Sequence, residues 1–115
     1  FIRICTPNVG NSGNSTIYAV PAGASSAALE SIVIGITAAN KTSSGVTVDI
    51  FIDNEDGSND VFIVKGASIP AGASLEVMAG NKLVLQNDGS NGDNLEALAS
   101  AANSVDVTVS VLEDV

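Results

Sequence analysis

Aliphatic residues recur at every second position in two stretches of the chain, and this period of two is the strongest constraint on its fold. In "VDVTVSVLED" (105–114) a valine occupies every second position from 105 to 111. In "VTVDIFID" (46–53) one set of alternate positions is entirely aliphatic: Val46, Val48, Ile50 and Ile52. Successive side chains of a strand point to opposite faces, so each stretch predicts a strand with a core face and a wetter face.

Turn-forming residues (Gly, Asn, Asp, Pro and Ser) interrupt the chain at short intervals, as in "TPNVGNSGNS" (6–15). Between the turns lie β-rich segments, at roughly 1–5, 15–20, 30–38, 46–52, 60–65, 75–78, 82–86, 95–100 and 105–112. This spacing predicts an all-β fold, a single-domain antiparallel β-sandwich of jelly-roll-like type with about eight short strands. The predicted domain spans residues 1–115, with 1–13 as an N-terminal arm or an edge strand.

Two segments leave alternatives open. "SIVIGIT" (31–37) is apolar on both faces, which is typical of a central strand covered on both sides or of a strand in a subunit contact. In "NLEALASAAN" (94–103), Leu95, Leu98 and Ala102 could form a helical stripe, whereas Leu95, Ala97 and Ala99 alternate as in a strand. We favour the strand because the neighbouring segments are all β.

The sequence Pro-Ala-Gly-Ala-Ser occurs twice, at 21–25 and at 70–74. Proline cannot donate to a strand ladder and therefore belongs at a strand end. A glycine two residues later is suited to the positive φ of a tight turn, so we expect Gly23 and Gly72 to supply it. Both copies predict a strand, a turn and a further strand at two edges of the sandwich, with a role in backbone geometry rather than ligand binding.

The charge balance excludes several partners. Thirteen acidic and four basic residues give a formal net charge of −9, and the basic residues are scattered singly along the chain. Nucleic-acid binding and attraction to an anionic membrane both need clustered Lys and Arg, so neither is expected. No apolar run approaches the roughly 20 residues of a membrane-spanning helix. The mean hydropathy is nevertheless positive. A chain with so few charges and with strands apolar on both faces indicates burial against other chains.

Catalysis is also not expected, and no catalytic residue is predicted. The chain has no His, so Ser-His and Cys-His arrangements and imidazole zinc sites are excluded. The single cysteine, Cys5, is interpreted as a small residue in or beside an N-terminal strand. A carboxylate-pair hydrolase needs two acids across a cleft, but most acids here fall in turns or, like Asp49 and Asp106, on polar strand faces. Only four aromatic residues are present, which weakens a carbohydrate-binding hypothesis.

The segment "DNEDGSND" (53–60) is a weak candidate for calcium, because Asp53, Glu55, Asp56 and Asp60 offer oxygen ligands. The spacing does not fit an EF-hand loop, and the same residues suit a solvated hairpin, so we favour a plain loop and predict no cofactor. "NDGSNGDN" (87–94), with Asp88 and Asp93, is interpreted in the same way.

Most of the chain, from about residue 14 to 114, resembles the small virion structural proteins of tailed bacteriophages, including phages of marine bacteria and cyanobacteria. "TIYAVPAGASSAALESIVIGITAANKTSSGVTVDIFID" (16–53) is similar to the family's "Y-x-VPAG" start and its "VTVDVFV" strand. The second half is similar to its "IPAG-x-SLE", "KLVL", "GD-x-L" and "ASAANSVDVTVSVLE" motifs. The "NDGSNGDN" segment departs from the family by being longer than the expected turn.

The resemblance implies a non-enzymatic structural protein present in several copies in the phage particle and assembled in the host cytoplasm. Its partners would be other virion proteins, of the capsid or the head–tail apparatus, and further copies of itself. The acidic charge and single small domain favour an external accessory or decoration protein over a shell component that faces DNA. The alternative is a carbohydrate- or receptor-binding β-sandwich module of a tail or fibre.

Overall fold

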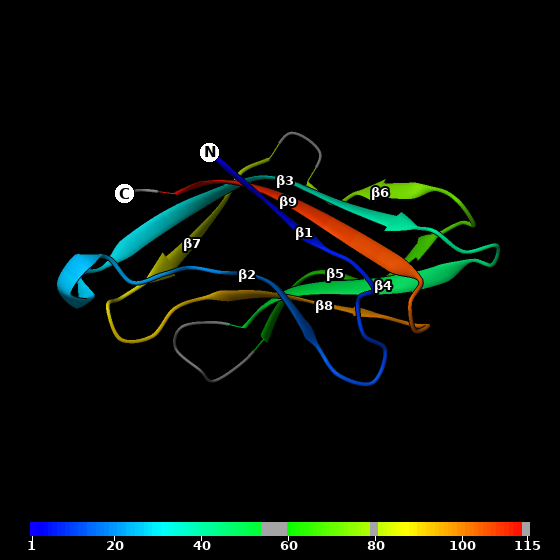
Figure 1. Ribbon diagram of the computed structural model, residues 1–115, viewed down its shortest axis with the longest axis horizontal. Helices are drawn as coiled ribbons and strands as arrows, with labels where there is room; N and C mark the ends of the chain where they lie inside the picture. The colour runs from blue at the N-terminus through cyan, green and yellow to red at the C-terminus, as the bar shows by residue number, and fades with distance from the viewer. Residues whose placement is uncertain (54–59, 79–80, 114–115) are drawn as a thin grey trace.

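The computed structural model describes residues 1–53, 60–78 and 81–113, which form two antiparallel sheets packed face to face (Figure 1). The strands are β1 (Ile2–Thr6), β2 (Ser15–Ala19), β3 (Leu29–Asn40), β4 (Val46–Asp53), β5 (Asp60–Ile69), β6 (Ser74–Glu76), β7 (Leu83–Asn87), β8 (Asn94–Ala99) and β9 (Val105–Glu113). One short 3-10 turn, η1 (Ala24–Ser26), precedes β3. The predicted all-β sandwich is confirmed. None of the described segments is a helix long and apolar enough to cross a membrane.

The two sheets have the strand order of a jelly roll. Sheet A has the order β1-β9-β3-β6, with β7 also paired to β3, and sheet B has the order β2-β8-β4-β5. β7 pairs with the Leu29–Val33 part of β3, whereas β6 pairs with the Thr37–Ala39 part. β6 and β7 therefore share the position beside β3 that one strand fills in an eight-stranded jelly roll.

The core between the sheets consists of the aliphatic side chains that the alternation assigns to it. The four alternate valines of β9 are at most 1% exposed, which confirms the predicted core face of that strand. In β8, Leu95, Ala97 and Ala99 are buried in the same core, so the strand interpretation of this segment is also confirmed. Burial of each such Val or Leu side chain contributes about 1.5–3 kcal/mol to folding.

β3 is an inner strand of sheet A, but its outer face is not covered by another described segment, since Ile34 is 39% exposed. The prediction of a strand covered on both sides is therefore wrong within the described chain, and the alternative of a subunit contact stays a prediction. β3 pairs with β9 on one side and with β6 and β7 on the other. Val33 and Ile36 point into the core. Between them the register with β9 shifts, because Val33 pairs with Val111 and Gly35 with Ser110. This β-bulge leaves Ile34 outside the core, 39% exposed.

Both Pro-Ala-Gly-Ala-Ser segments carry the chain from sheet B to sheet A, one between β2 and β3 and the other between β5 and β6. In the second segment the N–H of Ala73 donates to the carbonyl of Pro70 at 3.0 Å, and Gly72 has a φ of 69°. This is the geometry of a type II turn, so the role predicted for Gly72 is confirmed.

The same prediction for Gly23 is wrong. Gly23 has a φ of −71°, and the positive φ values in this segment belong to Ser25 and Ser26, at 57° and 61°. The connection to β3 is longer than that to β6, and its turn forms further along the chain. There the N–H of Ala27 donates to the carbonyl of Ala24, and the N–H of Gly23 donates to the carbonyl of Ala27.

Asn40, at the end of β3, fastens the second crossover to the turn between β3 and β4. Its side chain is 2% exposed, and its Nδ2 donates to the carbonyls of Ser44 at 2.8 Å and Ile69 at 3.0 Å. Its Oδ1 accepts the backbone N–H and the hydroxyl of Thr42. This one buried amide therefore satisfies polar groups from two segments, the β3–β4 turn and the end of β5.

Candidate functional site

The predicted calcium residues lie at the turn between β4 and β5. Asp53 ends β4 and Asp60 begins β5, their Cα atoms are paired across the hairpin, and both residues are exposed. Glu55 and Asp56 fall outside the described residues. In the parts of the chain that the structure describes, no three Asp, Glu or Cys side chains are grouped to hold a metal ion. The preference for a plain loop over a calcium site at this turn stays a prediction.

The acids of the β7–β8 loop organise its backbone. Asp88 Oδ1 accepts the N–H groups of Ser90 at 2.8 Å and Asn91 at 2.7 Å, and these hydrogen bonds hold the pKa of Asp88 below its usual range. Asp93 is 9% exposed, and its Oδ2 accepts the N–H of Gln86 at 2.9 Å. These contacts show that the acidic side chains of "NDGSNGDN" hold the backbone of the loop, and its interpretation as a plain loop rather than a calcium site stays a prediction.

The outer face of sheet B is covered by polar and aromatic side chains that contact one another. Glu96 of β8 is 9% exposed, and its Oε2 accepts the hydroxyl of Thr16 at 2.5 Å. Phe51 is paired with Glu96 across the strands and lies outside the core cluster, on the face that the alternation predicts for it, although it is buried. Its ring lies 5.0 Å from that of Phe62, and Lys65 Nζ lies 4.5 Å from the centre of the Phe62 ring.

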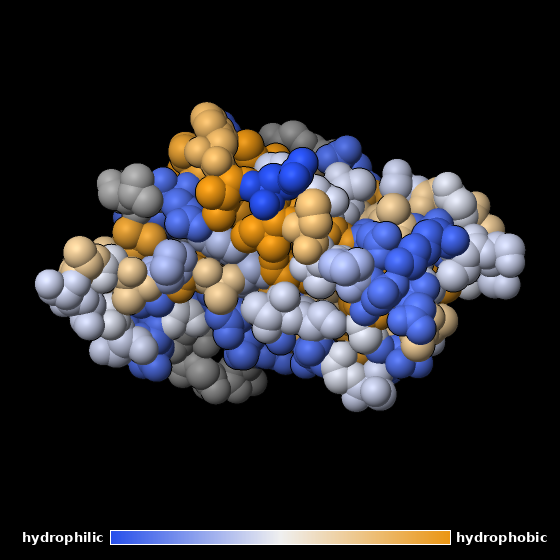
Figure 2. Space-filling model, in the orientation of Figure 1, coloured by the Kyte–Doolittle hydropathy of each residue, from blue (hydrophilic) through white to orange (hydrophobic). Residues whose placement is uncertain are grey.

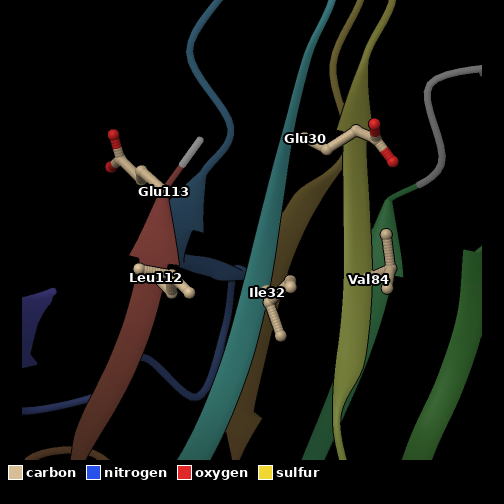
Figure 3. A pocket seen from close by; sticks show the side chains of 5 residues that line it. All are labelled: Glu30, Ile32, Val84, Leu112 and Glu113. Carbon is tan, nitrogen blue, oxygen red and sulfur yellow. The ribbon is translucent and has the colours of Figure 1, made fainter. Parts of the chain in front are cut away.

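The outer face of sheet A instead carries an exposed apolar surface, which we call the sheet A patch, formed by Ile32, Ile34, Val84 and Leu112. The register aligns Val84, Ile32 and Leu112 in one row across β7, β3 and β9 (Figure 3). Val84 is 53% exposed and Leu112 39%. Hydrophobic residues gather over the ends of β1 and β9 near the N-terminus (Figure 2). Single exposed apolar residues are normal, but such a cluster on one sheet face is typical of a contact surface.

A groove of about 380 Å³ runs over this row. It is lined by Glu30, Ile32, Val84, Leu112 and Glu113. Glu113 is paired with the buried Ser31, so it belongs to the opposite face of the strand from Leu112, and Figure 3 shows it pointing away from the groove. Glu30 is exposed on the same face as Ile32. The floor of the groove is therefore apolar, and its rim is acidic at the Glu30 end.

A basic residue borders the patch on its other side. Arg3 of β1 is exposed and is paired with Ser110, two residues before Leu112 in β9. Because Ile4 packs against the core, the alternation of β1 turns Arg3 and Cys5 to the outer face. Cys5 is a free, exposed thiol within β1, as expected for a residue of the N-terminal strand.

Sequence reasoning identified part of this surface. The apolar outer face of "SIVIGIT" indicated a covered strand or a subunit contact, and Ile32 and Ile34 are the residues concerned. Val84 and Leu112 were not singled out. The signal for Leu112 is present in the alternation, because it follows Thr108 and Ser110 on the face of β9 that is otherwise polar. The chain matches no protein-family model, and comparisons with curated proteins and with solved structures found no similar protein.

Proposed function

We propose that this chain is a non-enzymatic structural protein of a bacteriophage virion that acts through protein–protein contacts. It would be an external accessory or decoration protein on the capsid or the head–tail apparatus. The observation that carries the contact role is the sheet A patch, where Ile32, Val84 and Leu112 form an exposed apolar row with charged residues at its borders. Apolar surfaces with a polar rim are typical of sites where proteins bind each other.

The position of the patch on a sheet suits a structural contact. β3 and β9 are held by the longest ladder of sheet A, from Ser31–Glu113 to Asn40–Val105. Their inner side chains are packed in the core. A partner would therefore meet a preformed surface and would lose little binding free energy to ordering it.

The virion setting is supported by the resemblance of the strand and turn motifs. The jelly roll is compatible with it, because this fold recurs in viral capsid proteins, but it also recurs in lectins and cupins and does not assign a function by itself. The net charge of −9 favours a place on the outside of the particle, since a protein that lines the shell would face the phosphates of DNA. The partners would be other virion proteins and further copies of this chain.

The alternative, a carbohydrate- or receptor-binding module, has less support from the aromatic residues. Sugar rings commonly stack on exposed aromatic faces, but Tyr18 and Phe51 are 4% and 3% exposed. Phe62 is more exposed, yet Lys65 covers one face of its ring. Phe1 is the fully exposed aromatic residue of the described chain, at 89%.

The test is to mix the purified, unlabelled chain with phage particles that lack it, and to reconstruct the decorated particles. We expect saturable binding at defined positions of the particle. Leu112→Lys should abolish this binding, whereas Val61→Lys, at an equally exposed aliphatic residue of β5 outside the patch, should not. Saturable binding of the free chain to a glycan, without binding to particles, would contradict the proposal and support the alternative.

A further inference from the structure

We infer that the sheet A patch is a contact face between two copies of this chain, related by a two-fold axis that passes close to Leu112. The inference rests on the function proposed above and names a second copy of this chain as the partner of the same surface. The dimer would then contact the particle through other residues, and Leu112→Lys would lose particle binding because it separates the two copies. It is drawn from the way in which charges of opposite sign border the patch.

The strand register gives the position of each charge. Moving along β9, Ser110 is paired with Arg3 of β1, and Leu112 lies level with Ile32 of β3. Glu30 lies two residues from Ile32, in the direction that continues from Ser110 through Leu112. Arg3 and Glu30 are therefore at opposite corners of the patch, on either side of Leu112. Both are exposed, and both belong to the outer face of sheet A.

This arrangement is complementary to itself. In a two-fold contact the same surface of both subunits is used, so that if one residue contacts a second, the second also contacts the first. With an axis that lies in the contact plane, passes near Leu112 and is perpendicular to the line from Arg3 to Glu30, Arg3 of each copy meets Glu30 of the other, and the contact contains two ion pairs. A patch bordered by acids alone would require a basic partner instead. Glu113 also borders the groove, but it is paired with the buried Ser31, and its carboxylate interacts with Tyr18.

The apolar part of the patch fits the same contact. Sheets that pack face to face lie about 10 Å apart, with interdigitating side chains. The groove of about 380 Å³ beside Leu112 offers a space for the Leu112 side chain of the second copy. The net charge of −9 on each copy opposes association at long range. At physiological ionic strength this repulsion is screened beyond about 8 Å, whereas the contacting pairs stay effective.

The first experiment is sedimentation velocity on the full chain, under reducing conditions so that Cys5 cannot link two copies. We expect the wild type and Val61→Lys to sediment as dimers and Leu112→Lys as a monomer, with circular dichroism showing that each variant is folded. A monomeric wild type would overturn the inference, and so would a Leu112→Lys variant that stays dimeric.

The second experiment tests the orientation by charge reversal. Arg3→Glu and Glu30→Arg should each weaken dimerisation by about tenfold or more, because each places like charges in contact. The double variant Arg3→Glu/Glu30→Arg should recover most of the wild-type affinity. Loss of affinity in both single variants without recovery in the double variant would rule out the proposed two-fold arrangement.

The third experiment locates the axis. In a Cys5→Ser background, Leu112→Cys should be joined into a covalent dimer by a short bis-maleimide cross-linker, and Val61→Cys should not. Equal cross-linking of the two variants would contradict an axis near Leu112. These results are independent of the virion proposal: a dimer that does not bind particles would refute the proposed function alone, and a monomer that binds them would refute this inference alone.

Discussion

The phenol oxygen of Tyr18 lies 2.8 Å from Ser31 Oγ, and this hydrogen bond joins β2 of sheet B to β3 of sheet A. The two residues are 4% and 0% exposed, so both are shielded from bulk water. A buried polar group without a partner costs about 1–3 kcal/mol, which makes the pair a sensitive point of the sandwich.

We expect Tyr18→Phe to lower the free energy of unfolding by about 1–3 kcal/mol, because it leaves the Ser31 hydroxyl buried without its partner. Ser31→Ala should also destabilise the chain, and the double variant should lose less than the sum of the two single variants. Urea denaturation followed by circular dichroism measures all three. Ser68→Ala, at an exposed serine of β5, serves as the control. Strictly additive losses would show that the two hydroxyls do not interact.

The ionisation of Tyr18 offers an independent measurement, since the chain contains one Tyr and no Trp. Burial is the main cause that raises the pKa of Tyr18 to about 12, and a hydrogen bond with Glu113 and the charge of its carboxylate add to it. Absorbance of the phenolate should therefore rise near pH 12 in the folded chain, against about pH 10 in the unfolded one. A midpoint near pH 10 in chain shown to be folded would contradict the burial. Glu113→Gln should lower the midpoint only a little.

Because the pKa of Tyr18 is raised in the folded state, the stability of the chain should depend on pH in the alkaline range. The folded state holds the phenol proton more tightly than the unfolded state does. The contribution of Tyr18 to stability is thus fully present below about pH 10 and is lost as the pH rises towards 12. Urea denaturation at a series of alkaline pH values should show this loss in the wild type and not in Tyr18→Phe.

Asn40→Ala should destabilise the chain more than Tyr18→Phe does. We expect it to lower the free energy of unfolding by about 2–4 kcal/mol, because it removes both the donor and the acceptor of a buried hydrogen-bond network. The carbonyls of Ser44 and Ile69 and the N–H of Thr42 would all lose this partner. Asn81→Ala, at an exposed position, should change stability by no more than about 0.5 kcal/mol. Thermal unfolding of the two variants gives the comparison, and similar melting temperatures would count against the structural role of Asn40.

Replacing each of three glycines by Ala should lower the free energy of unfolding by different amounts, and the structure predicts their order. Gly72→Ala should cost about 1–2 kcal/mol, since a Cβ there has free space but the φ of 69° is strained for other residues. Gly89→Ala should cost more, because a Cβ at this position would lie 2.1 Å from the carbonyl oxygen of Ser26. Gly13→Ala meets nothing within 4 Å and should be neutral or slightly stabilising. Any other order, measured by denaturation, would contradict the backbone geometry of these loops.

The strands were predictable from the sequence because the alternation identifies which side chains of a strand face the core. The valines of β9 and the Leu95–Ala97–Ala99 series of β8 carry this information locally, without knowledge of the partner strands. Gly23 and Gly72 show that the local sequence does not determine which residue of a turn has a positive φ. The same five residues occur around both, yet the positive φ lies on Gly72 in one copy and on Ser25 and Ser26 in the other, because the chain that follows differs in length.

The sheet A patch was only partly predictable for a different reason. Ile32, Val84 and Leu112 come from three strands that are distant in the sequence, and they form one surface only through the order β7-β3-β9. Alternation can show that Leu112 faces away from the core, but it cannot show which side chains lie beside it. Strand order depends on pairing between strands that are distant in the sequence, and the alternation within one strand carries no information about this pairing.

The pairing of Ile2 with Val111 brings the start of β1 next to the end of β9 (Figure 1). A short flexible linker could therefore join these two segments, and new ends could be opened in the exposed loop at 11–14, between β1 and β2. Such a circular permutant would keep every strand pair of the jelly roll while placing any fused tag away from the surface on which the chain is proposed to assemble.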